Sequence, residues 1–542
     1  MTFFQTAPVL SNLYQQDFAL QAELKRRLKE KSKHICIQLE QMGHAAAQIL
    51  PAWLREAEQN PPRHIPYDAW GNRIDQIVTS AAWEKYRVFS AESGVVSIGY
   101  DKNLKANSRV AQTALLYLFS ASSATYSCPL AMTDAAARVL LDLASPALLD
   151  RLVPRLLSQD PQTFITSGQW MTERIGGSDV SHSETIARLH SRTDQEEYYT
   201  LHGVKWFTSA TTSEMALTLA RIEGEAGLTL FCVELNRQAG QGIAGIRINR
   251  LKDKLGTKAL PTAELTLDGV VATQIGPINR GVASIANMLN VTRYYNAVAS
   301  ASSMALSTLL VQEYAKIRQA FGKAIGEHVL FQNTLAVLQG TSAAAMSLCF
   351  EVADLLGKVE NKIANDNEAA RLRVLLPIAK LLLAKQAVAH ASETLECFGG
   401  AGYIEDTGLP RLLRDAQVLP IWEGTTNVLS LDVLRAERKQ NAFTILLADM
   451  SERLGCMNNV DKDAAEVVHE TAQLLQTKLR SLQTKSANDV EGFARRMSIT
   501  AGLLLQAVLL AEAVPYAVSG DNFAQRRFTA FVEHHLCGPL GF

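Results

Sequence analysis

Apolar residues recur every three to four positions over most of this chain, which is the spacing of amphipathic and buried helices. The runs 110–120 and 132–143 follow it closely. A polar segment containing Pro61, Pro62, Pro66 and Gly71 interrupts the pattern. The pattern predicts a helical region that extends to about residue 160 and is broken by one loop.

The pattern of apolar residues changes between about residues 165 and 280, where they form short alternating or β-branched runs. Turn-forming residues such as Asp194, Gly203, Gly224 and Gly269 separate these runs. Such a pattern is typical of strands joined by tight turns. It predicts a small all-β unit with strands near 198–201, 215–219, 228–233 and 263–267.

Helical spacing returns after residue 281 and continues to the end of the chain. The predicted helices are 281–317, 332–359, 367–397, one after Thr425, and a further helical region from 436. The fold class is therefore α+β, with a helical domain before the β unit and a helix bundle after it. The predicted domains are 1–164, 165–280, 281–437 and a C-terminal extension, 438–542.

Composition narrows the class of protein. The chain has 542 residues, of which 47% are hydrophobic and 20% charged, so it can bury a large core. Its net charge of −1 provides no general attraction for nucleic acid or an anionic membrane. Seven cysteines without a C-x-x-C pair indicate reduced thiols and argue against a zinc site, so no metal is expected. We expect a cytoplasmic protein without a membrane span, because the apolar stretch 499–514 contains Gln506 and Glu512.

One carboxylate lies in a segment that is unfavourable for a continuing helix. Glu423 is placed between Pro420 and Gly424 in the stretch 419–427. A loop held by its neighbours is a common way to present a catalytic base. The alternative is the first turn of a helix, with the carboxylate near the helix dipole and a threonine cap. The nine residues alone favour that alternative.

Two upstream submotifs favour the catalytic base over the helix turn. The runs 397–403 (CFGGAGY) and 410–416 (PRLLRDA) precede Glu423 at fixed separations. Together, 396–427 resembles the flavin-and-base segment of the acyl-CoA dehydrogenase superfamily, with its F-G-G-x-G-Y, R-D-A and Y/W-E-G-T elements. The resemblance implies the acyl-CoA dehydrogenase fold, an FAD cofactor, an acyl-CoA substrate and Glu423 as the α-proton base. The cofactor contacts implied in this segment are Glu396, Gly399, Gly400, Thr425 and Asn427.

Two further segments resemble flavin-binding motifs of the same superfamily. The run 170–179 is similar to T-E-x-x-A-G-S-D, although an ordinary turn is the alternative. The run 205–209 is similar to K-x-W-I-T-N, although a tryptophan there is more often a core residue. The resemblance places Trp206 beside the flavin and Thr208 near its N5 atom. The remaining contacts that it implies are Met171, Thr172, Gly177 and Ser178.

The segment 318–322 (RQAFG) resembles the superfamily element that binds the adenine-diphosphate half of FAD in a neighbouring subunit. The residues concerned are Arg318, Phe321 and Gln332. The alternative is a cation and a glycine cap at a helix end. If the resemblance holds, the protein is a homotetramer or a dimer of dimers. Arg293 is implied to support the substrate loop, and its alternative role is a solvated charge after a Thr292 helix cap.

Four segments, 11–14, 67–75, 128–133 and 250–256, resemble the AidB-like branch, which also has a helical C-terminal extension. The favoured function is α,β-dehydrogenation of an acyl-CoA; the resemblance names no electron acceptor. DNA binding ranks second. Residues 441–542 carry nine lysines and arginines against eleven aspartates and glutamates, and this balance of −2 argues against the basic surface that DNA binding needs. A local basic patch would comprise Arg495, Arg496, Arg526 and Arg527. A third hypothesis is an acyl-CoA-binding sensor with little turnover.

Overall fold

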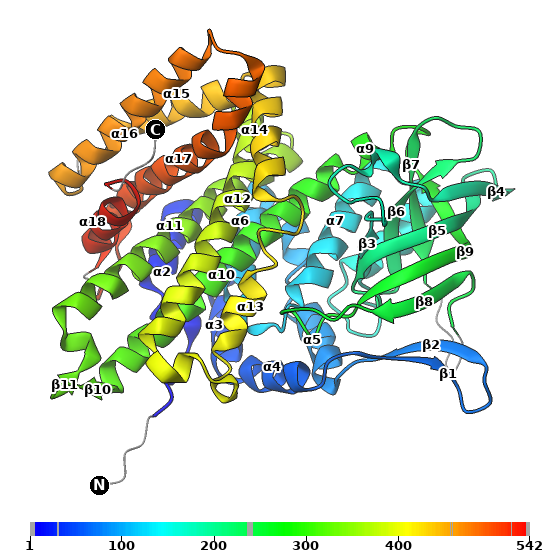
Figure 1. Cartoon of the computed structure of the whole chain (residues 1–542), viewed down its shortest axis with the longest axis horizontal. Coiled ribbons are helices and arrows are strands. Elements are labelled where there is room, and N and C mark those ends of the chain that lie inside the picture. The colour runs from blue at the N-terminus through cyan, green and yellow to red at the C-terminus, as the bar shows by residue number, and fades with distance from the viewer. Residues whose placement is uncertain are drawn as a thin grey trace. The chain divides into compact units, whose positions relative to one another are not determined.

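The structure, a computed structural model, describes residues 6–29, 32–235, 242–455, 457, 459–521 and 523–537 (Figure 1). The chain forms two compact units. The bundle unit comprises Met1–Leu50, Gly99–Ser122 and Asn296–Phe542. The sheet unit comprises Pro51–Ile98 and Ser123–Tyr295. Each unit thus draws on segments that are far apart in the sequence, and the four sequence-defined domains stay a prediction.

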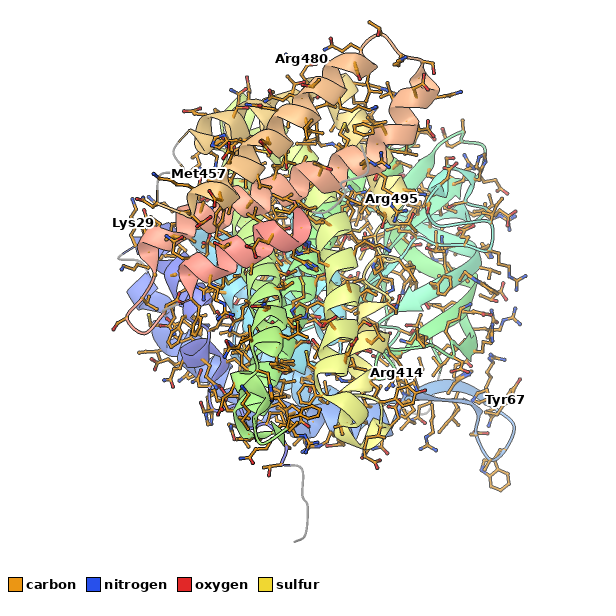
Figure 2. The ribbon with its side chains drawn as sticks, turned by 60° about the vertical axis from the view of Figure 1, so that its left-hand side comes forward. Lys29, Tyr67, Arg414, Met457, Arg480 and Arg495 are labelled. Carbon is orange, nitrogen blue, oxygen red and sulfur yellow. The ribbon has the colours of Figure 1, made fainter. Side chains whose placement is uncertain are left out.

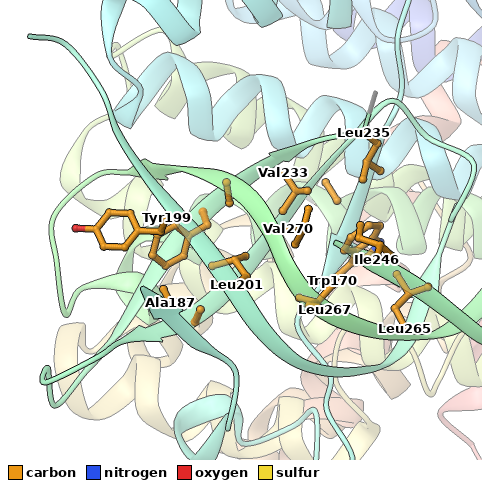
Figure 3. Packing of buried hydrophobic residues seen from close by; sticks show 14 of the residues in the cluster. Trp170, Ala187, Tyr199, Leu201, Val233, Leu235, Ile246, Leu265, Leu267 and Val270 are labelled. Atoms are coloured by element: carbon orange, nitrogen blue, oxygen red, sulfur yellow. The ribbon is translucent and has the colours of Figure 1, made fainter. Parts of the chain in front are cut away.

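The sheet unit contains a seven-stranded sheet in the order β3-β6-β4-β5-β9-β7, with β8 paired to β9. An additional pairing between β6 and β7 closes five of these strands into a ring, so the predicted all-β unit has the form of a small barrel. Buried side chains such as Trp170, Phe231 and Leu265 fill its interior (Figure 3). The strands are β3 Ser167–Trp170, β4 Ile186–Arg192, β5 Glu197–Ser209, β6 Met215–Ile222, β7 Leu228–Glu234, β8 Ile246–Leu251 and β9 Thr262–Ile275.

Helices and a β-hairpin complete the sheet unit. The helices are α4 Leu50–Gln59, α5 Ala81–Glu92, α7 Ser127–Leu143, α8 Pro146–Leu156, α9 Gly281–Ser284 and the start of α10, up to Tyr295. The hairpin, β1 Arg63–Tyr67 and β2 Arg73–Val78, lies where the sequence predicted a loop, so that prediction is wrong. Pro66 is tolerated because the ladder is irregular between Ile65 and Tyr67. Asp68 closes the turn by accepting hydrogen bonds from the backbone N–H groups of Trp70 and Asn72.

The bundle unit is built on long helices close to the predicted ranges. α12 starts with a capping box between Asn365 and Glu368. The predicted helix 281–317 is divided into α9, Gly281–Ser284, and α10, Ala286–Ile317. A helix cap at Thr292 is wrong, because its hydroxyl donates to the Met288 carbonyl inside α10 (3.1 Å). The other helices of this part are α1 Leu13–Gln16, α2 Phe18–Leu28, α3 Ser32–Gln48, α6 Ser108–Phe119, α11 Val329–Glu360, α12 Asp366–Cys397, α13 Pro410–Ala416 and α14 Thr426–Gln440.

The C-terminal extension is helical, as predicted, with α15 Ala442–Leu454, α16 Lys462–Leu482, α17 Ala487–Ala513 and α18 Ala524–His535. Two stretches, Val329–Glu360 and Ala487–Tyr516, are long and apolar enough to cross a membrane. Their most apolar windows are 83% and 78% buried inside the protein, which is the behaviour of core helices. In α17, Gln506 exchanges two hydrogen bonds with Gln386 of α12 (2.9 and 3.0 Å), which fixes how these helices pair.

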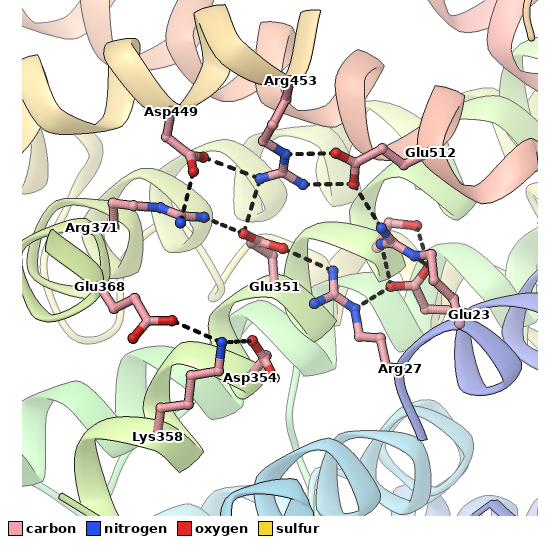
Figure 4. Close-up of polar contacts among 12 residues, drawn as sticks. Glu23, Arg27, Glu351, Asp354, Lys358, Glu368, Arg371, Asp449, Arg453 and Glu512 are labelled. Carbon is pink, nitrogen blue, oxygen red and sulfur yellow. Dashed lines mark hydrogen bonds and ion pairs between the residues drawn. The ribbon is translucent and has the colours of Figure 1, made fainter. Parts of the chain in front are cut away.

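An ion network joins the extension to the rest of the bundle unit (Figure 4). Glu351 of α11 accepts hydrogen bonds from Arg27 of α2 (2.9 Å), Arg371 of α12 (2.6 Å) and Arg453 of α15 (3.0 Å). Arg453 also forms a bidentate pair with Glu512 of α17 (2.7 Å for both bonds). Burial raises the pKa of Glu351, but the three guanidinium groups outweigh it and hold that pKa well below its usual range. Five helices therefore meet around one ionised carboxylate.

We predict that Glu351→Gln destabilises the protein by about 3–5 kcal/mol, because it leaves buried cations without their counter-charge. The midpoint of urea unfolding measures the effect. Asp354→Asn is the matched control: Asp354 lies on the same helix and its pair with Lys358 is about one third exposed, so the expected cost is about 0–1 kcal/mol. Equal costs for the two variants would contradict the assignment.

The same variant carries a pH prediction. Since the folded-state pKa of Glu351 lies below the ordinary value of 4.5, its stabilisation is fully present above that value and is lost as the pH falls. The difference in unfolding free energy between wild type and Glu351→Gln should therefore be constant near neutral pH and shrink below pH 4.5. Urea unfolding at a series of pH values measures it.

Candidate active site

The segment carrying Glu423 is a loop pinned at both ends within the bundle unit. The Asn296 side chain on α10 donates to the Leu419 carbonyl (3.2 Å). Lys380, fully buried on α12, donates to the Gly424 carbonyl (2.7 Å). Between them, Glu423 has φ = +55° and Gly424 has φ = +104°. A glutamate in the left-handed region is uncommon and costs on the order of 1–3 kcal/mol, and such residues cluster at functional sites.

The alternative of a threonine-capped first helical turn is wrong for Glu423. α14 begins only at Thr426, and the side chain of its N-cap residue, Thr425, makes no capping hydrogen bond. The Asn427 side-chain oxygen accepts a hydrogen bond from Arg495 of α17 (3.1 Å). Thr425 and Asn427 are exposed, so both predicted cofactor contacts are accessible next to the base.

The glycine turn after α12 presents bare backbone. Gly399 has φ = +57°, and a Cβ at Gly399 or at Gly400 would meet nothing within 4 Å. By contrast, a Cβ at Gly402 would collide with the Leu395 carbonyl, so that glycine is required by packing. Glu396 is exposed near the end of α12. The open surface over Gly399 and Gly400 allows a planar or phosphate group to approach the main chain closely.

The segment 318–322, which the resemblance predicts to contact FAD in a neighbouring subunit, forms a β-hairpin. The alternative, a helix end capped by a glycine, is not what the structure shows. β10 (Gln319–Ala320) and β11 (Lys323–Ala324) pair, and Phe321 (φ = +54°) and Gly322 (φ = +83°) form the two-residue turn. The Phe321 side chain is 97% exposed. Arg318 precedes the hairpin. Gln332 fastens the following turn by donating to the Gly326 carbonyl (2.9 Å).

In the sheet unit, the predicted flavin loop follows β3. The backbone of Glu173 and Gly176 exchanges two hydrogen bonds (3.2 and 3.1 Å), which closes a tight turn. Gly176 has φ = +152°, a region that disfavours the alanine usual in the resembling motif. A Cβ at Gly177 would lie 2.5 Å from the Thr172 hydroxyl. Met171 is buried and Ser178 is exposed, so the loop presents hydroxyls and main chain.

The strand β5 carries Trp206 and Thr208 where its pairing with β9 is irregular, between Lys205 and Thr208. The backbone N–H of Trp206 donates to the Thr172 carbonyl (2.9 Å), so this hydrogen bond joins the two predicted flavin-binding segments. The Thr208 side chain is fully buried, and its hydroxyl donates to the Ala263 carbonyl (2.8 Å). In this arrangement the Thr208 hydroxyl can accept a further hydrogen bond but has no second proton to donate.

Sequence reasoning missed a buried ion pair beneath this loop. Lys205 Nζ lies 2.7 Å from Glu173 Oε1, and both side chains are at most 2% exposed. Burial raises the pKa of Glu173, but Lys205 and the Thr185 hydroxyl outweigh it and lower that pKa overall. Both residues stand in the quoted motifs, yet the sequence does not show that their side chains meet.

Lys252 was also missed, although it lies in the segment 250–256 singled out above. Its ammonium is 3.6 Å from the centroid of the Trp206 ring. The Arg174 guanidinium lies 5.4 Å from the same ring. Two cations thus lie against the ring of the tryptophan that is predicted to pack beside the flavin.

Two cavities of about 700 and 720 Å³ lie in the bundle unit, and Glu423 lines neither. The first is bounded mainly by the 15–19 segment, α10, α11 and α18. The second lies between α16 and α17. Arg527 lines the first cavity and pairs with Asp521, whereas Arg495 and Arg496 line the second. The hypothetical patch of four arginines is therefore divided between two places.

Two other predictions on the site are not decided by this geometry. Among the described residues, His, Cys, Asp and Glu side chains form no group of three or more that could hold a metal ion. Arg293 is partly buried on α10 within the sheet unit. The absence of a metal and the supporting role of Arg293 both stay predictions.

Comparison with known proteins gives a consistent result along the chain. Three family models match: the AidB N-terminal domain (residues 5–161), the acyl-CoA dehydrogenase middle domain (168–270) and the acyl-CoA dehydrogenase C-terminal domain (279–437). Acyl-CoA dehydrogenase family member 11 of Caenorhabditis elegans is 42% identical over 94% of this chain and 85% of its own length. AidB of Escherichia coli (strain K12) is 32% identical, over 81% and 80%.

A solved structure is also similar over nearly the whole chain. It is Caenorhabditis elegans ACDH-11 in complex with C11-CoA. Its TM-score is 0.92 at 40% identity, with 99% of this chain and 93% of that chain covered. The likeness includes the C-terminal extension, which lies beyond the three matched family models.

The backbone strain at Glu423 can be measured directly. Because asparagine tolerates φ near +55° better than longer side chains, we predict that Glu423→Asn is more stable than Glu423→Gln by about 1 kcal/mol. Both changes remove the same charge and leave a side-chain amide, so the variants differ mainly in side-chain length and in the backbone preference that follows from it. Thermal unfolding of the two variants provides the measurement, and a more stable Gln variant would show that the loop relaxes to another conformation.

Proposed function

The chain belongs to the acyl-CoA dehydrogenase family, and from that premise we propose that it removes hydrogen from Cα and Cβ of an acyl-CoA thioester. The predicted family, its AidB-like branch, the fold class and the class of FAD-dependent dehydrogenase are thereby confirmed. The roles of individual residues belong to the proposal. The observation that carries it is the strained, doubly anchored loop that presents Glu423.

Glu423 takes the α-proton. An α-proton of a thioester is only weakly acidic, so the base needs a partner that stabilises the developing enolate oxygen. The Glu423 backbone N–H supplies such a donor, and donors of this kind are often the largest single catalytic contribution. FAD supplies the acceptor for the hydride that leaves Cβ, and the product is the α,β-unsaturated thioester. Lys380 and Asn296 hold the loop so that carboxylate and N–H keep their places.

Within each unit, the predicted contact residues offer groups of the kind that FAD requires. Gly399 and Gly400 offer open main chain, and Ser178 and Thr425 offer exposed hydroxyls. These are neutral hydrogen-bonding groups suited to a diphosphate. Glu396 is the exception, since a carboxylate next to a phosphate is unfavourable. We therefore propose that the Glu396 side chain stays in solvent, where the structure places it.

The length of the acyl chain and the oligomeric state are also part of the proposal. The ACDH-11 complex with C11-CoA supports an acyl group of medium length as a substrate for this chain. A 97% exposed phenylalanine at the tip of a hairpin supports a second subunit as its partner, because such a side chain gains from burial. We propose a homotetramer or dimer of dimers acting in the cytoplasm on fatty acyl-CoA.

The alternative of an acyl-CoA sensor differs only in turnover. A sensor would bind the thioester and shift the flavin spectrum without losing the absorbance of the oxidised flavin. A dehydrogenase bleaches that absorbance when substrate is added without oxygen. Acyl-CoAs of four to sixteen carbons, tested one by one in this way, separate the two hypotheses and define the chain-length preference.

We predict that Glu423→Gln keeps FAD but loses flavin bleaching by acyl-CoA, by about 10²–10⁴-fold in rate. The amide preserves the shape of the side chain and removes its ability to take a proton. Stopped-flow absorbance under anaerobic conditions measures the rate, and the visible spectrum reports the bound flavin. Bleaching at the wild-type rate would remove Glu423 as the base, and a colourless wild-type protein that takes up no FAD would end the proposal.

We predict that Phe321→Ser weakens the assembly and FAD retention together, if the hairpin contacts a neighbouring subunit and its cofactor. The turn tip is solvent-exposed, so the substitution should leave the fold of the single chain intact. Analytical ultracentrifugation over a range of concentrations, with absorbance at both protein and flavin wavelengths, follows both properties. Leu330→Ser is the control, because Leu330 is also highly exposed but lies outside the hairpin. Equal behaviour of the two variants would count against this interface.

A further inference from the structure

A basic groove lies between α16 and α17 of the C-terminal extension. It has a volume of about 720 Å³ and is lined by Lys478, Lys485, Arg495 and Arg496. These are four of the nine lysines and arginines found between residues 441 and 542, which carry eleven carboxylates. Figure 2 labels Arg495 at this place and Arg480 elsewhere on α16. Positive charge is thus gathered in one hollow of an otherwise acidic segment.

Among the described residues, no carboxylate forms an ion pair with any of these four cations; the Lys485 charge is only a minor cause, after the Ser486 hydrogen bonds, of the lowered pKa of Asp489. The arginines deeper in the unit behave differently, since Arg453 and Arg527 both form short ion pairs. One carboxylate, Asp489, lines the groove, but it is engaged in the capping box of α17 with Ser486. Four like charges around one hollow repel one another unless an anion is present. The groove therefore has the electrostatics of an anion-binding site.

The rest of the lining indicates which kind of anion fits. Phe493, Ile499 and Leu503 provide an apolar wall, and Ser481 and Thr500 provide hydroxyls. The volume lies in the range of pockets for small organic ligands. Apolar surface beside clustered cations suits a base or sugar that carries phosphate groups. A DNA duplex would instead need a long basic stripe, and the balance of −2 over this segment opposes it.

We propose that the groove between α16 and α17 binds the phosphate groups of a nucleotide-type ligand. Three sources share this chemistry: the 3′-phosphate of CoA, a diphosphate as in ADP or FAD, and a free nucleotide. Arg495 connects the groove to the base loop through its bond to Asn427, four residues after Glu423. The groove and the start of α14, the helix that follows the base loop, therefore share one arginine. Binding itself does not depend on the dehydrogenase reaction.

The test uses the full-length, FAD-loaded protein and isothermal titration with adenosine 3′,5′-bisphosphate and with ADP. These probes lack the pantetheine arm, so they do not compete through a thioester pocket. The variant is Lys485→Gln with Arg496→Gln. The matched control is Lys462→Gln with Arg480→Gln, which removes the same charge from exposed positions outside the groove. Thermal unfolding at the wild-type temperature establishes that each variant is folded.

We expect wild type and control to bind one of these probes, the groove variant to bind it at least tenfold more weakly, and affinity to fall with salt. A preference for adenosine 3′,5′-bisphosphate, matched by CoA over dephospho-CoA, identifies the CoA phosphate as the source; equal binding of ADP identifies a diphosphate. The proposal is overturned if neither probe binds, if groove variant and control bind equally, or if only duplex DNA shows a groove-dependent loss.

Discussion

The buried ion network centred on Glu351 is the constraint on which the arrangement of the bundle unit depends. Taking several charges out of water costs several kcal/mol for each ion, and this cost is offset only when every charge has well-placed partners. Here arginines from α2, α12 and α15 all pair with the one carboxylate of Glu351. Arg453 of α15 also pairs with Glu512 of α17, which adds that helix to the network. The helices cannot shift singly without leaving a buried charge unpaired, so the network selects one packing of the extension against the bundle.

This fixed packing has a consequence for the base loop. The loop is held from α10 by Asn296 and from α12 by Lys380, and its far side continues into α14, whose Asn427 bonds to Arg495 of α17. A left-handed conformation at Glu423 persists only where the surroundings over-determine it. The supports come from three helices of a bundle locked by the ion network. The strain at one residue is thereby sustained by interactions many residues away.

How far the sequence predicted this molecule depended on whether a signal was local. The range of α12 was predicted to within one residue, because its capping residues and the glycines after it are local signals. The hairpin β1–β2 was missed because prolines dominate its composition, and only its register shows that Pro66 falls at an irregularity. The hydroxyl of Thr292 was misassigned because a cap and an internal helical hydrogen bond use the same residue type.

For the site, too, the sequence predicted the contiguous motifs but not the contacts between separate segments. Short motifs were enough to select Glu423, Trp206 and the glycine turn as candidates, since each motif is contiguous in the sequence. The pair Lys205–Glu173 and the position of Lys252 over Trp206 arise from strand register, which no single segment encodes.

The charge of the extension is the clearest case. Its balance of −2 argues against a general polyanion surface, yet it conceals a groove lined by four cations without ion-pair partners among the described residues. Net charge is a sum over the whole segment, whereas binding depends on which charges the fold brings to one hollow.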